Sequence, residues 1–215
     1  MKKNMYSLML TEEVVREVDK LAARQGTNRS NLVNQILAEY VSFITPEKRT
    51  GDIFAFVKEG LSGYGDYDFV LAPHDMTMSV KSALSVKYRP TVKYDVQLFR
   101  SDEECMGELR VIFRTQSVEL LRSLSRFFVA FVDMERKYLR RYFPWNESSY
   151  RLDDGRFVRR FRAPKSGSGN EGRAIVAYIR MFDDELKGVL SGRYVSVEDM
   201  ESRYLVYLNG DTDII

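Results

Sequence analysis

Cysteine and histidine are almost absent from this chain of 215 residues, which contains one of each, Cys105 and His74. A single cysteine excludes a disulfide framework and a cysteine-rich zinc site, and it is typical of proteins that work in a reducing cytosol. One histidine cannot supply the several ligands that a typical transition-metal site uses. The composition therefore predicts no metal centre.

Long apolar runs and a strong charge of one sign are also missing. No run approaches the roughly 18 apolar residues that span a bilayer, and no signal-peptide pattern opens the chain, so we expect a cytoplasmic protein without a membrane partner. The formal net charge is only +2 at pH 7. Any binding to nucleic acid must therefore come from local patches of basic residues.

Catalytic signatures are missing as well. The sequence contains no motif of the kinds that mark phosphate-binding loops, dinucleotide sites or zinc proteases. His74 and Asp75 are adjacent, and adjacent side chains seldom point together, so we expect no acid–base pair there. Cys105 follows Glu103 and Glu104, whose negative charges disfavour the reactive thiolate. The sequence therefore predicts no enzyme activity, no catalytic residue and no cofactor.

The opening segment, residues 4–10, alternates between two faces as a β-strand does. One face carries Tyr6, Leu8 and Leu10, and the other carries Met5, Ser7 and Met9. A strand this short is not stable alone, and the economical partner is the same strand of a second copy, related by a two-fold axis. Such a ribbon has one face on a helical core and the other free for a DNA major groove, which admits a two-stranded β-ribbon.

Two helical patterns follow, joined at Gly26. Thr11 is placed to cap the first helix with its hydroxyl, and Thr27 and Asn28 are candidate caps of the second. Gly26 readily takes the left-handed conformation that ends a helix, and Pro46 closes the second pattern. Apolar residues recur on one face of each helix: Val14, Val15, Val18, Leu21 and Ala22 in the first, and Leu32, Val33, Ile36, Leu37 and Tyr40 in the second.

The order strand, capped helix, glycine turn and capped helix resembles the ribbon-helix-helix family of DNA-binding proteins, of the MetJ, Arc and CopG types. The likeness rests on residues 8–12 (LMLTE), on the apolar face of the first helix and on residues 26–30 (GTNRS) followed by Leu32. It covers residues 4–40 without a gap, about a fifth of the chain. The resemblance implies an intertwined homodimer, and dimers of this family commonly pair into tetramers on DNA.

The resemblance also implies which residues meet double-stranded DNA. The outward face of the ribbon would meet the bases, and the start of the second helix would hold a phosphate through backbone N–H groups, with further phosphate contacts from the N-terminal lysines. The residues concerned are Lys2, Lys3, Met5, Ser7, Met9, Asn28, Arg29 and Ser30. Two of the three ribbon positions depart from the family, because methionine cannot donate a hydrogen bond to a base. The alternative is an apolar strand face covered by the second domain.

The sequence predicts an α+β architecture: a ribbon-helix-helix domain at residues 1–45, a helical linker at 46–61 and an α+β domain at 62–215. Alternating stretches at 76–81, 84–88, 91–99 and 107–115 have no helix between them, so we expect an antiparallel meander. Val92, Tyr94, Val96 and Leu98 would point inward. A broad apolar stripe predicts a buried helix at 118–143. Strands are expected at 157–162 and 174–180, helices near 183–190 and 197–208, and loops at 62–68 and 165–172.

Positive charge accumulates at residues 136–165, a stretch that contains ten basic residues and three acidic ones. Aromatic residues interleave with the bases, a mixture that suits backbone contact and stacking with nucleic acid. The alternative is a solvated helix end and an edge strand whose arginines prevent aggregation. The candidate nucleic-acid or partner surface consists of Arg140, Arg141, Arg156, Arg159, Arg160 and Arg162.

Together these patterns predict a homodimeric, nucleoid-associated transcriptional regulator of the repressor type, whose C-terminal domain binds a small-molecule effector or a partner. A second hypothesis is an adaptor that uses the ribbon-helix-helix for dimerisation only and binds RNA or a protein through residues 136–165. An antitoxin would be a variant of this hypothesis. However, the C-terminal part contains too many helix and strand patterns to be the extended tail with which a typical antitoxin wraps its toxin.

Overall fold

The chain divides into two compact units, Met1–Arg49 and Thr50–Ile215. The computed structural model describes residues 5–64, 67–71, 76–84, 90–100, 105–143, 149–153, 155–164 and 169–215. The division falls inside a helix and four residues beyond the predicted end of the N-terminal domain at residue 45. The predicted combination of an α+β fold and an antiparallel sheet is confirmed.

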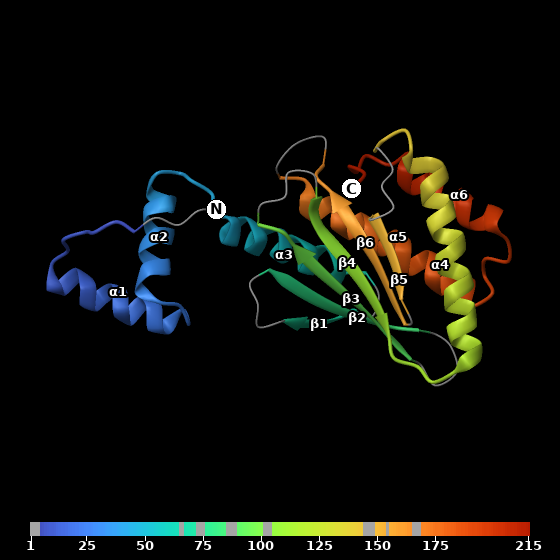
Figure 1. The fold of residues 1–215 in the computed structure, drawn as a ribbon, viewed down its shortest axis with the longest axis horizontal. Coiled ribbons are helices and arrows are strands. Elements are labelled where there is room, and N and C mark those ends of the chain that lie inside the picture. The colour runs from blue at the N-terminus through green and yellow to red at the C-terminus, as the bar shows by residue number, and fades with distance from the viewer. Residues whose placement is uncertain are drawn as a thin grey trace. The chain divides into compact units, whose positions relative to one another are not determined.

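The first unit contains two helices joined by a tight turn, α1 (Glu12–Arg24) and α2 (Arg29–Tyr40) (Figure 1). Gly26 turns the chain with a φ of +64°, as predicted. Asn28 caps α2, since its side chain accepts a hydrogen bond from the backbone N–H of Asn31 at 2.9 Å. The predicted hydroxyl cap at Thr11 is wrong: Thr11 makes no side-chain capping bond. Two glutamates in the first turn of α1 complement the positive helix end instead.

Residues 5–11 form neither helix nor strand in the single chain. A strand that pairs only with the same strand of a second copy has no hydrogen-bonding partner in a single chain, so the ribbon stays a prediction. Its first residue, Asn4, lies outside the described residues together with Lys2 and Lys3.

Helix α3 (Pro46–Ser62) confirms the helical segment predicted at residues 46–61 and crosses the boundary between the units. In the second unit its residues Ile53, Val57 and Leu61 belong to the core. Gly60 allows a close approach to α5 (Glu171–Leu190), because a Cβ there would lie 2.8 Å from a methyl carbon of Val176. Helix α3 is therefore a packed layer of the second unit as well as a link.

The second unit is built on a six-stranded antiparallel sheet with the order β1-β2-β3-β4-β6-β5. The strands are β1 (Tyr67–Leu71), β2 (Thr77–Ala83), β3 (Thr91–Leu98), β4 (Cys105–Phe113), β5 (Tyr150–Asp153) and β6 (Arg156–Arg162). Strands β2, β3 and β4 pair in the predicted antiparallel order, β1 adds an unpredicted strand beside β2, and β6 pairs with β4. The predicted inward residues of β3, Val92, Tyr94, Val96 and Leu98, are all buried.

Helices pack against the face of the sheet that carries these residues. In Figure 1, α5 lies behind the strands, and α4 (Val118–Leu139) and α6 (Val197–Leu208) lie on the right of the drawing. The ring of Phe182 on α5 joins the layers, with centroid distances of 6.2 Å to Tyr94, 4.9 Å to Phe131 of α4 and 5.4 Å to Phe157 of β6. Aromatic pairs of this kind add about 0.5–1.5 kcal/mol each beyond their buried area.

The strand predicted at residues 174–180 is wrong, because the stretch lies inside α5. The sheet, α3 and α6 enclose this helix, so most of its sides are buried, including Ala174, Ile175, Val176 and Tyr178. Residues 174–180 (AIVAYIR) form a short, largely apolar run, which periodicity alone cannot distinguish from a buried strand. The start of α5 at Glu171 also falls inside the loop predicted at residues 165–172.

Two short strands were not predicted. Strand β1 starts inside the loop predicted at residues 62–68, and β5 lies in the basic stretch. Both are edge strands of the sheet, with few residues to reveal an alternation. Helix α4 ends at Leu139, four residues before the predicted end. His74, Glu103, Glu104 and residues 85–88 of one predicted strand lie outside the described residues.

Candidate nucleic-acid interface

The first unit exposes the apolar side chains that amphipathic helices normally bury. Among its described hydrophobic residues, Ala22, Leu32 and Ala38 are buried in the single chain. The exposed ones are Met5, Tyr6, Leu8, Met9, Leu10, Val14, Leu21, Ile36, Leu37, Tyr40, Val41, Phe43 and Ile44. Exposed apolar residues gathered in so short a segment mark an interface. The unit therefore presents the faces that a second copy of the chain could cover.

The predicted base-reading residues are accessible. Met5 and Met9 are 97% and 101% exposed, and Ser7 is exposed as well. The predicted phosphate partners Lys2 and Lys3 lie outside the described residues.

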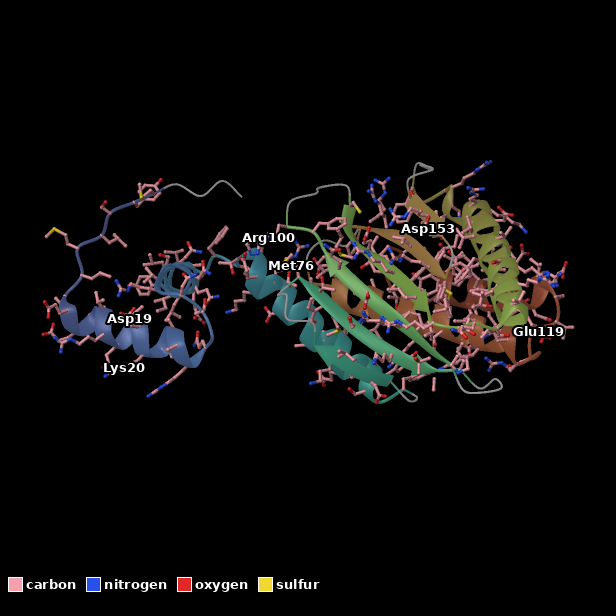
Figure 2. All side chains as sticks on the ribbon, turned by 60° about the horizontal axis from the view of Figure 1, so that its bottom comes forward. Asp19, Lys20, Met76, Arg100, Glu119 and Asp153 are labelled. Atoms are coloured by element: carbon pink, nitrogen blue, oxygen red, sulfur yellow. The ribbon has the colours of Figure 1, made fainter. Side chains whose placement is uncertain are left out.

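The predicted phosphate site at the start of α2 contains a residue that sequence reasoning missed. Asp19 of α1, labelled in Figure 2, holds Arg29 in a two-pronged ion pair, with Nε to Oδ1 at 2.7 Å and Nη2 to Oδ2 at 2.5 Å. The hydrogen bond from Arg29 lowers the pKa of the Asp19 carboxyl. Ser30 is exposed, while the side chain of Asn28 serves as the cap. Arg29 is thus partly neutralised before any phosphate arrives.

Strand β6 separates the predicted basic surface into two faces. Arg156 and Arg160 are exposed, and Arg162 is partly exposed on the same side of the strand. Arg159 points the other way and is only 3% exposed, so its assignment to a surface is wrong. Successive residues of a strand point to opposite faces, and Arg159 lies an odd number of positions from each of the other three arginines, so it lies on the inward face.

The aromatic residues of the basic stretch fall into two groups. Phe157 and Phe161 are fully buried in the core, so the prediction of an interleaved basic and aromatic surface is wrong for these two rings. Tyr138, Tyr142 and Phe143 are partly exposed, and Lys137 and Arg141 lie 5.0 Å from the ring centroids of Tyr138 and Tyr142. Arg140 and Arg141 follow the end of α4 and are exposed, as predicted.

Buried Arg159 belongs to a polar network inside the second unit. Its Nε donates to Oε2 of Glu135 at 3.0 Å, and its guanidinium carbon lies 4.4 Å from the ring centroid of Tyr178. The fully buried Glu135 also accepts hydrogen bonds from the hydroxyls of Tyr150 at 2.5 Å and Tyr204 at 3.1 Å. Sequence reasoning missed Glu135, because nothing local shows that α4 turns this residue toward β6.

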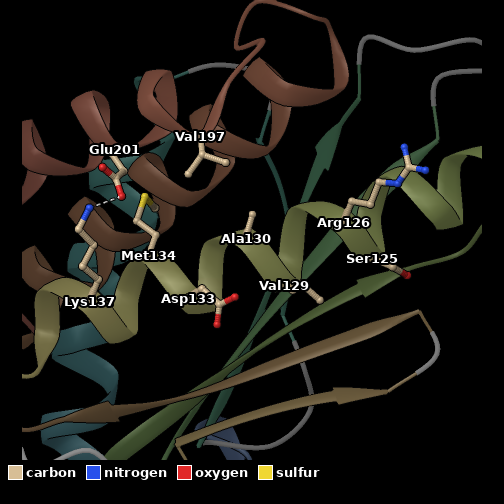
Figure 3. A pocket seen from close by; sticks show the side chains of 9 residues that line it. All are labelled: Ser125, Arg126, Val129, Ala130, Asp133, Met134, Lys137, Val197 and Glu201. Carbon is tan, nitrogen blue, oxygen red and sulfur yellow. Dashed lines mark hydrogen bonds and ion pairs between the residues drawn. The ribbon is translucent and has the colours of Figure 1, made fainter.

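An open groove of about 650 Å³ lies between α4 and α6 (Figure 3). Its apolar wall is formed by Val129, Ala130, Met134 and Val197, and an ion pair of 2.7 Å joins Lys137 to Glu201 at one end. The volume lies within the range of small-molecule sites, which combine apolar walls with a few polar groups. The groove is therefore the candidate effector site among the described residues.

Glu185 of α5 is a buried carboxyl for which both oxygens lack a hydrogen-bond partner among the described residues. Burial, with the nearby charge of Asp184, raises its pKa from 4.5 to about 8. The folded protein therefore holds a proton that the unfolded chain releases above pH 4.5, so a rise in pH favours unfolding.

We expect the free energy of unfolding to fall by about 1–3 kcal/mol between about pH 5 and about pH 8. The Glu185→Gln variant, which cannot ionise at this position, should lose most of this pH dependence. The stabilising contribution of the proton is complete below the unfolded pKa and is lost as the pH rises through the folded pKa. Urea unfolding at several pH values measures the effect. Glu198→Gln, at an exposed position of α6, is the matched control. An equal pH dependence in wild type and Glu185→Gln would contradict the assignment.

Neither the described residues nor any known relative points to a further kind of site. Within the described ranges, no group of three or more His, Cys, Asp or Glu side chains could hold a metal ion, and no helix is long and apolar enough to cross a membrane. Comparison with models of known families, with curated proteins and with solved structures found no match to this chain. The ribbon-helix-helix resemblance therefore stays a prediction.

Proposed function

We propose that the protein is a homodimeric, DNA-binding transcriptional regulator. In this proposal the first unit forms a ribbon-helix-helix dimer, and the second unit binds an effector or a partner. The observation that carries the proposal is the set of apolar side chains that the first unit leaves exposed along both helices and along the segments that flank them. A second copy would bury these faces and would supply the strand partner that residues 4–10 need.

In the proposed mechanism the ribbon enters the major groove, and the two copies of α2 hold the flanking backbone. Ser7 is the polar side chain at the centre of the ribbon face, where it can exchange hydrogen bonds with base edges. Met5 and Met9 can contact thymine methyl groups. The backbone N–H groups at the start of α2 suit a phosphate oxygen, and this contact positions the dimer without reading sequence.

The test is a fluorescence-anisotropy titration of the whole chain against the DNA upstream of its own gene and against a scrambled duplex, at two salt concentrations. We expect tighter binding to the upstream DNA and a steep loss of affinity with salt. The molar mass measured by light scattering should be that of a dimer. Equal, weak binding to both duplexes would overturn the proposal.

Two substitutions separate base reading from phosphate contact. We expect Ser7→Ala to change the ratio of affinities for the two duplexes, because it removes a hydrogen-bonding group from the ribbon face. We expect Arg29→Ala to weaken binding to both duplexes alike. Unchanged affinities for both variants would contradict the assigned roles.

The Asp19–Arg29 pair leads to a substitution that should strengthen DNA binding. Asp19→Asn removes the negative charge that compensates Arg29, so we expect DNA affinity to rise by roughly two- to fivefold and the salt dependence to steepen by about one phosphate contact. The gain should be equal for both duplexes and should disappear in the variant that also carries Arg29→Ala. Glu17→Gln, an exposed position on the same helix, is the control. A loss of affinity in Asp19→Asn would contradict the prediction.

The adaptor hypothesis is the second candidate, and one observation favours it. Arg29 is held by a carboxylate and two ribbon positions are methionines, so the first unit offers few groups for reading DNA. Under this hypothesis the first unit only dimerises, and RNA or a protein binds the exposed arginines of the second unit. A stable dimer that binds both duplexes weakly and equally would support the adaptor.

A further inference from the structure

The outward face of the sheet in the second unit is a charged surface. This face consists of the side chains that alternate with the buried ones along each strand, and many of them are exposed or partly exposed. Its basic residues are Lys81, Lys93, Arg110, Arg151, Arg156, Arg160 and Arg162, and its acidic residues are Asp68, Asp95, Glu108 and Asp153. Seven basic residues thus meet four acidic ones.

Most of the acidic residues are already neutralised by a base on their own strand. Lys93 pairs with Asp95 at 2.9 Å, Arg110 with Glu108 at 2.5 Å and Arg151 with Asp153 at 3.1 Å. The fourth, Asp68 of β1, lies directly opposite Lys81 of β2. Arg156 lies opposite Asp153, and Arg160 lies opposite Glu108, but each of these carboxylates is already paired with an arginine of its own strand. The surplus of positive charge among the described residues of this face therefore lies on β6, at Arg156 and Arg160.

The chemistry of this face favours a nucleic-acid backbone over unpaired bases. None of its described outward positions carries an aromatic ring on which a base could stack, since the aromatic residues of β6 point into the core. Val158, between the outward arginines, has Arg110 and Arg151 as its cross-strand neighbours. Guanidinium groups held on a rigid strand suit phosphate oxygens, which they can bind with two parallel hydrogen bonds.

We infer that this face, centred on Arg156 and Arg160, is a second contact surface for the phosphate backbone of duplex DNA. The inference rests on the proposed function, because the first unit delivers the second unit to the duplex. Once the first unit is bound, the covalent link keeps the second unit at a high effective concentration near the same duplex, so even a weak contact adds to the overall affinity. It adds no sequence preference, because phosphates carry no sequence information.

The test compares the whole chain with Arg156→Gln/Arg160→Gln, on the upstream and the scrambled duplex, over several salt concentrations. Both arginines are exposed, so we expect the variant to fold normally. Its affinity for both duplexes should fall by roughly tenfold or more at low salt, with the slope of log K against log salt shallower by about 1.8. The ratio of the two affinities should stay unchanged.

The matched control is Arg122→Gln/Arg126→Gln, which removes two exposed arginines from α4. This helix packs on the buried face of β6, where Phe128 stacks on Phe157 at 5.0 Å. An equal loss in the control, an unchanged slope in the sheet variant, or a loss confined to RNA would overturn the inference. A wild-type protein without preference for the upstream duplex, combined with the expected loss in the sheet variant, would instead reject the proposed function and leave the surface assigned.

Discussion

Leu37→Asp is expected to convert the protein from a dimer to a monomer and to lower its affinity for upstream DNA by at least about a hundredfold. Leu37 lies on the apolar face of α2 and is 50% exposed in the single chain. In a monomer, a charge at so exposed a position changes stability little. In the proposed dimer the same charge would be buried without a partner, and that cost falls on association. Light scattering gives the mass, and anisotropy gives the affinity.

Val206→Asp is the matched control, because Val206 is also an exposed apolar residue, on α6 of the second unit. We expect it to leave both mass and affinity unchanged. A wild-type protein that is already monomeric, or a Leu37→Asp variant that stays dimeric with full affinity, would contradict the proposed dimer. The pair of variants thus separates a specific interface from a general effect of surface charge.

Local features of the first unit could be predicted because they depend on neighbouring residues alone. Gly26 takes a positive φ, and Asn28 caps α2, in agreement with their positions between two apolar periods. The ion pair of Arg29 could not be predicted, because its partner Asp19 lies ten residues away and the turn at Gly26 brings the two together. The ribbon depends on a second copy of the chain, which no pattern within one chain can test.

In the second unit, prediction succeeded where one side of an element is buried and the other is not. Strand β3 has a core face and an outward face, and its buried apolar residues are those predicted. Prediction failed for the first half of α5, because residues 174–180 form a short, largely apolar run that periodicity alone cannot distinguish from a buried strand. It also failed for Arg159: the alternation of β6 places this residue inward, but charge alone indicated the surface.

Arg159→Leu is expected to lower the free energy of unfolding of the second unit by about 3–5 kcal/mol. The substitution removes the cation from Glu135, which is fully buried and would then keep only hydroxyl donors such as Tyr150 and Tyr204. Arg160→Leu, the same change on the exposed side of the strand, should alter stability by less than about 0.5 kcal/mol. Urea unfolding followed by near-ultraviolet circular dichroism, which reports the packing of aromatic rings, measures both.

The double variant Glu135→Leu/Arg159→Leu tests whether the cost lies in the unpaired charge or in the lost packing. Replacing both partners removes the buried charges together, so the double variant should be more stable than Arg159→Leu alone. The loss of stability that remains in the double variant comes from the hydroxyls of Tyr150, Tyr178 and Tyr204, which no longer have the Glu135 carboxylate as their shared hydrogen-bond acceptor. The single variant Glu135→Leu completes the comparison. A loss in the double variant equal to the sum of the losses in Glu135→Leu and Arg159→Leu would show that the two residues act independently, and would contradict the buried ion pair as the source of the effect.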